Sequence, residues 1–146
     1  MRINVEIQYA VLLALYLQRA GRAQLPDAAA QLSLSLSFLQ QISRKLVKAK
    51  VLISFRGRAG GYELSKPDIT IKDIFDALDP INLISREEKT RYSTGVVESR
   101  AFYRFASNLR SLMTPLLNKT IGDIVKELVA KEVEQREKAV ETGIIQ

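Results

Sequence analysis

The sequence contains no cysteine, no histidine and no tryptophan among its 146 residues. Without cysteine it cannot form disulfides, and without cysteine or histidine it lacks the usual ligands of iron–sulfur clusters and zinc sites. Pairs of serine or cysteine with histidine, which carry out nucleophilic catalysis, are excluded in the same way. We therefore expect no metal cofactor and no enzymatic activity. The lack of cysteine also agrees with a reducing compartment such as the cytoplasm.

The chain has no long hydrophobic run either. Residues 9–17, YAVLLALYL, are uninterrupted apolar sequence, but nine residues are too few to cross a bilayer. The same stretch could form the core of a signal peptide, but no cleavage motif of small residues follows it closely. We interpret it as part of a buried helix over residues 4–20 and expect a soluble cytoplasmic protein.

Positive charge is concentrated in one part of the chain. The net charge is +6, and residues 34–66 contain seven lysines and arginines but a single acidic residue. Residues 67–146 contain twelve basic and thirteen acidic residues and are close to neutral. A basic segment in an otherwise balanced chain is typical of a protein that binds anions, with nucleic acid as the first candidate.

Apolar spacing predicts two short helices after the first one. Pro26 suits the first turn of a helix over LPDAAAQL, and a serine can cap the next helix, at about residues 36–49. The apolar residues of this next helix recur at spacings of three and four, so they share one buried face: Leu39, Ile42, Leu46 and Ala49. Two short helices with a tight connection predict a helix-turn-helix.

The opposite face of the second short helix is polar and basic, and consists of Ser37, Gln40, Gln41, Arg44, Lys45 and Lys48. Such a face could simply be solvated. However, it contains no acidic residue, so the usual charge pairs between neighbouring turns are missing. Glutamine can bind adenine and arginine can bind guanine in the major groove, while serine and lysine suit phosphates. The face therefore predicts a DNA recognition helix.

A β-hairpin is predicted after this helix, with strands at residues 51–55 and 61–65 around the loop RGRAG. The glycines do not have the spacing of a dinucleotide-binding loop or a P-loop, and a strand rather than a helix follows them. The loop could be a tight turn with solvated arginines. After a basic helix we favour a wing in which Arg56 and Arg58 contact DNA.

The second half of the chain has a different pattern. Residues 81–93 are polar and predict a connecting loop, and the following helix carries apolar residues at heptad spacing: Phe102, Phe105, Leu109, Leu112 and Leu116. These residues could pack inside one chain, but dimerisation is favoured because helix-turn-helix proteins commonly bind two half-sites. Pro115 should kink or end this helix. A last helix should run from residue 121 to about 140, with Ile121, Ile124, Val125 and Leu128 facing inward.

The segment LSLSFLQQISRKLVKAKVLISFRGRAGGYELSKP resembles the Rrf2 family of bacterial winged-helix transcription regulators. Arg2, Tyr9-Ala10 and the segment TIKDIFDALDP resemble the same family, so the similarity covers residues 1–80, and the rest matches in layout. The resemblance implies a homodimer that binds palindromic operators, often containing A·T pairs. In that family Ser37, Gln40 and Gln41 would face the bases, and Arg56 and Arg58 would belong to the wing.

Three departures from the family are visible. Phe38-Leu39-Gln40-Gln41 replaces the usual Tyr-Leu-Glu-Gln, and an amide in place of a carboxylate should change the preferred base. Glu6 and Gln8 occupy positions that are basic in the family. Many members also carry three cysteines before the dimerisation helix, whereas PINLISREEKTRYSTG has none, so a family-type cluster is chemically ruled out here.

These observations predict a mainly α protein with a small β-hairpin. Residues 1–80 would form a winged helix-turn-helix domain, 81–93 the connecting loop, and 94–146 the dimerisation and C-terminal helices. The expected function is that of a dimeric, sequence-specific DNA-binding regulator, a repressor, with its effector, whether a small molecule or a protein, left open. The alternative is a winged-helix module that binds an acidic protein partner, and the response of binding to salt and DNA sequence distinguishes the two.

Overall fold

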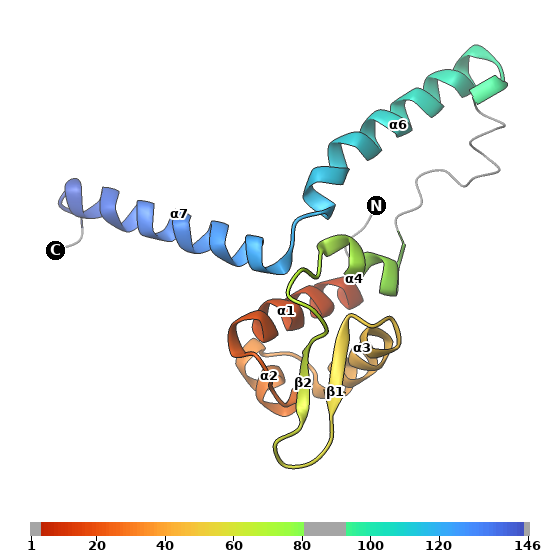
Figure 1. Ribbon diagram of the computed structural model, residues 1–146. Helices are drawn as coiled ribbons and strands as arrows, with labels where there is room; N and C mark the ends of the chain where they lie inside the picture. The colour runs from red at the N-terminus through yellow and green to blue at the C-terminus, as the bar shows by residue number, and fades with distance from the viewer. Residues whose placement is uncertain (1–3, 81–92, 145–146) are drawn as a thin grey trace.

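The computed structural model describes residues 4–80 and 93–144 (Figure 1). Three helices and a hairpin come first: α1 Val5–Ala20, α2 Leu25–Leu32, α3 Leu36–Lys48, β1 Leu52–Phe55 and β2 Gly61–Leu64. Three further helices follow: α4 Ile71–Leu78, α6 Val97–Leu117 and α7 Ile121–Glu141. This is a winged helix-turn-helix with two long helices appended, as the sequence predicts.

The hydrophobic core lies between α1, α2, α3 and the start of the hairpin. Leu13, Ala28, Leu39 and Ile42 are each 0% exposed, and Leu46 is 1% exposed. The predicted apolar face of α3 is therefore confirmed at three positions. It is wrong at Ala49, which is exposed, because the helix ends at Lys48 and Ala49 lies in its C-cap.

A tight turn connects α3 to the hairpin. The N–H of Val51 donates to the carbonyl of Leu46 at 2.9 Å, and Lys50 adopts the left-handed conformation with φ of 61°. This is the hydrogen bond of a Schellman motif, in which the left-handed position usually carries glycine. The turn reverses the chain sharply, so Val51 and Leu52 enter the core and β1 runs back beside α3 (Figure 1).

The hairpin is antiparallel, with Leu52 paired to Leu64 and Phe55 paired to Gly61. The connection between α1 and α2 forms an isolated antiparallel bridge to this two-stranded sheet, which the sequence does not predict. Ala23 and Tyr62 exchange both backbone hydrogen bonds, at 3.0 and 2.8 Å. Gly61 is required at this crossing, because a Cβ there would lie 2.4 Å from the carbonyl oxygen of Ala23.

The first turns of α4 and α7 lie side by side. Each helix begins with a capping box, Thr70 with Asp73 and Thr120 with Asp123, and the chain segments before them exchange hydrogen bonds. Ile121 donates to the carbonyl of Ile69 at 2.9 Å and its side chain is 1% exposed. Hydrogen bonds from the side chain and then the backbone of Thr120 lower the pKa of the Asp123 carboxyl. The hydrogen bond from Ile121 to Ile69 and the burial of the Ile121 side chain anchor the start of α7 to the winged domain.

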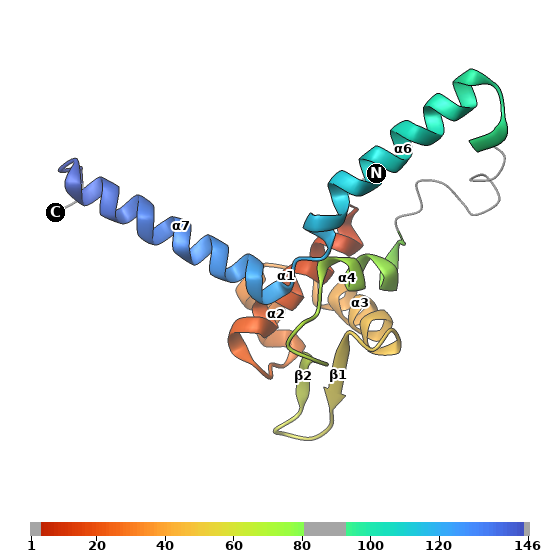
Figure 2. The ribbon, with the colours of Figure 1, turned by 45° about the horizontal axis from the view of Figure 1, so that its top comes forward.

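Beyond these anchors α6 and α7 extend away from the winged domain in different directions (Figures 1 and 2). α6 contains Pro115 and continues for two residues beyond it to Leu117, so it does not end at the proline. The expectation that Leu128 faces inward is wrong, since its side chain is 57% exposed. Only the start of α7 is anchored on the winged domain, where Ile121 is buried and Ile124 and Val125 are partly buried.

None of the helices in the described parts of the chain is long and apolar enough to span a membrane. The predicted connecting loop falls mostly on residues 81–92 and lies outside the described residues.

Candidate nucleic-acid interface

The outer face of α3 is open to solvent. Ser35 caps the helix, its hydroxyl accepting from the N–H of Phe38, and the helix period then turns one set of side chains away from the core. All six residues proposed from the sequence are exposed: Ser37, Gln40, Gln41, Arg44, Lys45 and Lys48. Ser43 is the polar residue on the inner side, where its hydroxyl donates to the carbonyl of Leu39 at 2.8 Å. The helix therefore presents amides, a guanidinium and lysines to solvent.

One of the six basic-face residues already has an acidic partner. Lys45 Nζ lies 2.6 Å from Glu6 Oε1 on α1, and both side chains are partly exposed. The ion pair joins two residues 39 positions apart, so the spacing of charges within α3 could not reveal it. Glu6 partly neutralises Lys45, and Arg44 and Lys48 are the stronger candidates for contacts to phosphate.

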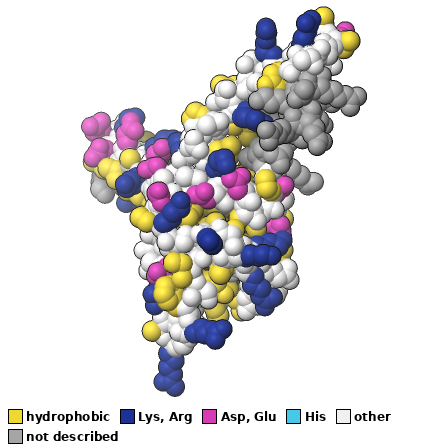
Figure 3. All heavy atoms as spheres, turned by 45° about the vertical axis from the view of Figure 1, so that its right-hand side comes forward, with side chains coloured by type: hydrophobic (Ala, Val, Ile, Leu, Met, Phe, Trp, Pro, Cys, Tyr) yellow, Lys and Arg dark blue, Asp and Glu magenta, His cyan; other side chains and the backbone are white. Residues whose placement is uncertain are grey.

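The hairpin carries the second part of the surface. Residues 56–59 of the wing tip are all exposed, including Arg56 and Arg58. Gly57 has φ of 92°, a conformation that favours glycine, and the N–H of Gly60 donates to its carbonyl at 3.0 Å. Figure 3 shows lysine and arginine side chains projecting at the hairpin end of the molecule.

Gly60 determines the shape of the wing tip. A Cβ at this position would lie 2.3 Å from the carbonyl oxygen of Phe55 and 2.8 Å from that of Gly57. Gly60→Ala should therefore distort the turn and lower the free energy of unfolding by about 1–3 kcal/mol, measured by urea denaturation. Gly57→Ala is the matched control, since nothing lies within 4 Å of the added methyl group and only the positive φ opposes it. A smaller loss for Gly60 than for Gly57 would contradict this account.

A groove brings helix and wing together. It is lined by the start of α2, the outer face of α3 and both strands of the hairpin, and its residues include Gln40, Arg44, Ser54 and Phe55. Gln40 and Arg44 therefore face the base of the wing across a shared hollow. The tertiary structure places the two predicted elements on one continuous surface.

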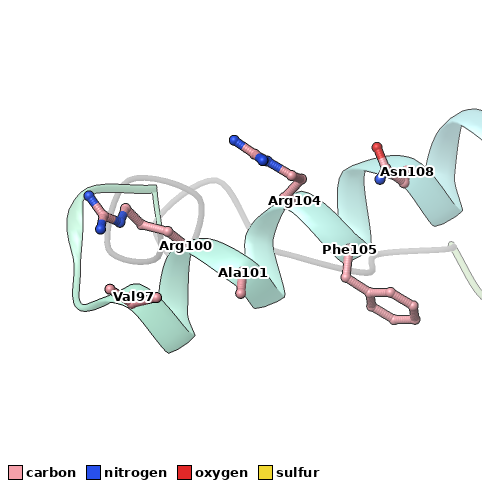
Figure 4. Close-up of a pocket in the computed structure, with 6 residues that line it drawn as sticks. All are labelled: Val97, Arg100, Ala101, Arg104, Phe105 and Asn108. Carbon is pink, nitrogen blue, oxygen red and sulfur yellow. The ribbon is translucent and has the colours of Figure 1, made fainter.

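The predicted dimerisation residues lie on α6. Phe102, Phe105, Leu112 and Leu116 are 48%, 62%, 74% and 63% exposed, and Leu109 is partly buried. A hollow on the same helix is lined by Val97, Arg100, Ala101, Arg104, Phe105 and Asn108 (Figure 4). In that view Phe105 projects to the side of the helix away from Arg104 and Asn108. The chain by itself thus leaves an apolar stripe on α6 in contact with solvent.

The carboxylates near α4 serve local structure. Asp73 belongs to the capping box, and Asp76 pairs with Lys72, which raises the pKa of that lysine through a hydrogen bond and then through charge. Within residues 4–80 and 93–144, no three histidine, cysteine, aspartate or glutamate side chains are grouped so that they could hold a metal ion.

The family model of Rrf2, described as an iron-dependent transcriptional regulator, matches residues 3–127. The chain belongs to the Rrf2 family. IscR of Aliivibrio salmonicida, an HTH-type transcriptional regulator, is 38% identical over 85 residues, which are 54% of this chain and 50% of that protein. The chain thus spans about half the length of the curated relatives that it matches.

Solved structures show the same Rrf2 architecture over most of the chain. CymR of Staphylococcus aureus is 25% identical with a TM-score of 0.59, and covers 83% of this chain and 95% of its own. IscR of T. potens superimposes with a TM-score of 0.66 at 24% identity, and the match covers 88% of this chain and 88% of that chain. These similarities confirm the winged-helix fold that the sequence predicts.

The iron dependence in the family description does not fit the donor atoms of this Rrf2 chain. The sequence has neither cysteine thiolates nor histidine imidazoles, the ligands on which iron–sulfur centres depend.

Proposed function

We propose that this Rrf2 protein is a homodimeric, sequence-specific DNA-binding regulator that represses transcription without an iron–sulfur cluster. The observation that carries the proposal is the exposed, acid-free face of α3, which shares a groove with the arginine-bearing wing. The relatives matched by sequence carry the name of transcriptional regulators, which supports the same function.

In this proposal α3 enters the major groove and the wing follows the DNA backbone. Gln40 and Gln41 read base edges as amides, and Arg44 reads guanine or a phosphate, according to register. Arg56 and Arg58 stand at the exposed tip, from which they reach phosphates or a narrow minor groove. In this arrangement the base contacts of α3 determine which DNA sequence is bound, and the backbone contacts of the wing fix the position of the protein along the DNA.

Dimerisation is proposed through the apolar stripe of α6. A protein in water seldom leaves a phenylalanine and two leucines along one helix more than half exposed, as Phe105, Leu112 and Leu116 are here, unless a partner covers them. Their spacing suits side-by-side helices, and a second copy of the chain supplies the same stripe. Two copies would then present two recognition helices to the two halves of a palindrome, about 34–36 Å apart or a multiple of that distance.

Titration of labelled genomic fragments at several salt concentrations tests the proposal. We expect a linear decrease of log K with log salt, with a slope near −0.9 for each phosphate contacted, and one fragment that survives competitor DNA. Binding should be the same with and without an iron chelator. Equal affinity for every fragment, or binding only to an acidic protein, would reject the proposal.

Gln40→Glu tests the base-reading role of α3. A carboxylate accepts from the amino group of cytosine, whereas an amide pairs with adenine, so the preferred base should change by about 1–3 kcal/mol of discrimination. Selection from a library of randomised sites measures this preference. Ser43→Ala, on the buried side of the same helix, is the control and should leave the preference unchanged. An unchanged site for Gln40→Glu would remove this residue from base readout.

A further inference from the structure

We propose that Arg22, assisted by Gln24, is a positioning residue that holds the wing in the orientation required for DNA. The inference rests on the proposed function, and it adds a residue outside both the recognition helix and the wing. Arg22 lies in the short connection between α1 and α2, far in sequence from the hairpin that it contacts.

The backbone brings Arg22 to the wing. Ala23 pairs with Tyr62 through two hydrogen bonds, so the connection forms an isolated antiparallel bridge to β2. Side chains alternate along an extended chain, and the residues on either side of Ala23 therefore point in the same direction. Both of them reach the hairpin: Arg22 contacts Phe55, Ala59 and Glu63, and Gln24 contacts Arg58.

The guanidinium of Arg22 makes three kinds of contact at once. Its carbon lies 3.5 Å from the centroid of the Phe55 ring, and Nη1 donates to the carbonyl of Ala59 at 3.3 Å. Nε donates to the Glu63 carboxylate at 3.4 Å. A planar group with several donors can stack and bind two acceptors together, which a lysine ammonium cannot do. The arginine therefore joins both strands and the tip of the wing.

The contacts of Arg22 and Gln24 stabilise a hairpin that has few stabilising interactions of its own. The strands are four residues each, and a two-stranded hairpin of this kind is marginally stable by itself. Gln24 donates to the carbonyl of Arg58 at 3.2 Å, one residue before the carbonyl that Arg22 binds. Two adjacent carbonyls of the exposed tip are thus held from outside the hairpin, next to the arginines expected to contact DNA.

The positive charge of Arg22 also supports DNA binding by the wing. Glu63 is the single acidic residue of residues 34–66, and its carboxylate pairs with Arg22. Without Arg22 that carboxylate would remain unpaired on the wing and would repel DNA phosphates. Loss of Arg22 is therefore expected both to loosen the wing and to lower its positive potential.

Amide hydrogen exchange in the free, full-length protein tests the positioning role directly. The hydrogen-bonded amide of Gly60 reports on the tip, and that of Tyr62 reports on the bridge to Ala23. In Arg22→Ala they should exchange about five- to tenfold faster, while amides of α3 exchange as in the wild type. Arg19→Ala removes the same charge from an exposed site at the end of α1 and should leave both sets unchanged.

Arg22→Lys separates positioning from a direct phosphate contact. If Arg22 positions the wing, the lysine variant should exchange as fast as the alanine variant and bind DNA nearly as weakly. Wild-type exchange at Gly60 and Tyr62 in Arg22→Ala, or wild-type DNA binding in Arg22→Lys, would overturn the inference. If the wild type itself binds no DNA fragment, the proposed function fails, and the exchange rates still decide whether Arg22 holds the wing.

Discussion

Phe105→Asp should convert the protein to a monomer and weaken its binding to a palindromic operator by about 10²–10⁴-fold. Phe105 belongs to the exposed stripe of α6, and its side chain is 62% exposed in the single chain. A carboxylate there would be buried without a partner in a dimer but solvated in a monomer, so the substitution penalises the dimer alone. Analytical ultracentrifugation measures the mass, and fluorescence anisotropy measures the affinity.

The matched control for this change is Ser111→Asp. Ser111 is exposed on the same helix but outside the heptad stripe. The aspartate in Ser111→Asp therefore adds the same charge as in Phe105→Asp, but outside the proposed interface. It should stay dimeric, and both variants should keep the thermal midpoint of the winged domain because neither residue is buried. A dimeric Phe105→Asp variant would show that α6 is not the dimer interface.

Replacing Arg56 and Arg58 together by alanine should weaken DNA binding by about 10²-fold at low salt and reduce its salt dependence. Each phosphate contact that is lost lowers the slope of log K against log salt by about 0.9, and a dimer carries two wings. Both arginines are exposed at the tip, so the free energy of unfolding should change little. Urea denaturation and binding titrations at four or more salt concentrations measure the two effects separately.

Arg19→Ala combined with Arg136→Ala controls for net charge in this experiment. Both residues are exposed and lie outside the wing and α3, so the variant loses the same charge from other surfaces. Its binding curve should stay close to that of the wild type. An unfolded wing variant, or a salt slope equal to that of the control, would contradict a role of the wing in binding phosphates.

The parts of the fold that the sequence predicts depend on neighbouring residues. The buried and exposed faces of α3 follow from the helical period, and the capping box of Thr70 and Asp73 involves residues three positions apart. The wing follows from glycines between two short β-prone segments. Leu39, Ile42 and Leu46 are buried as predicted because each faces the core within one regular helix.

The two wrong burial predictions have different physical origins. The apolar spacing predicts that Ala49 is buried only if α3 continues through it, and the turn at Lys50 ends the helix first. The spacing predicts that Leu128 faces inward only if all of α7 packs against the chain, and α7 leaves the winged domain after its first turns (Figure 1). A periodic pattern shows which residues share a face, and it does not show whether another element covers that face.

The sequence by itself therefore determined the winged helix-turn-helix, the exposed basic face of α3 and the absence of thiolate and imidazole ligands. Only the tertiary structure decided which residues far away in the sequence contact α3 and the wing. It pairs Lys45 with Glu6 across 39 positions, and it places Arg22 against Glu63 across 41. Such contacts depend on the path of the whole chain, because a helix period or a turn motif relates residues only a few positions apart.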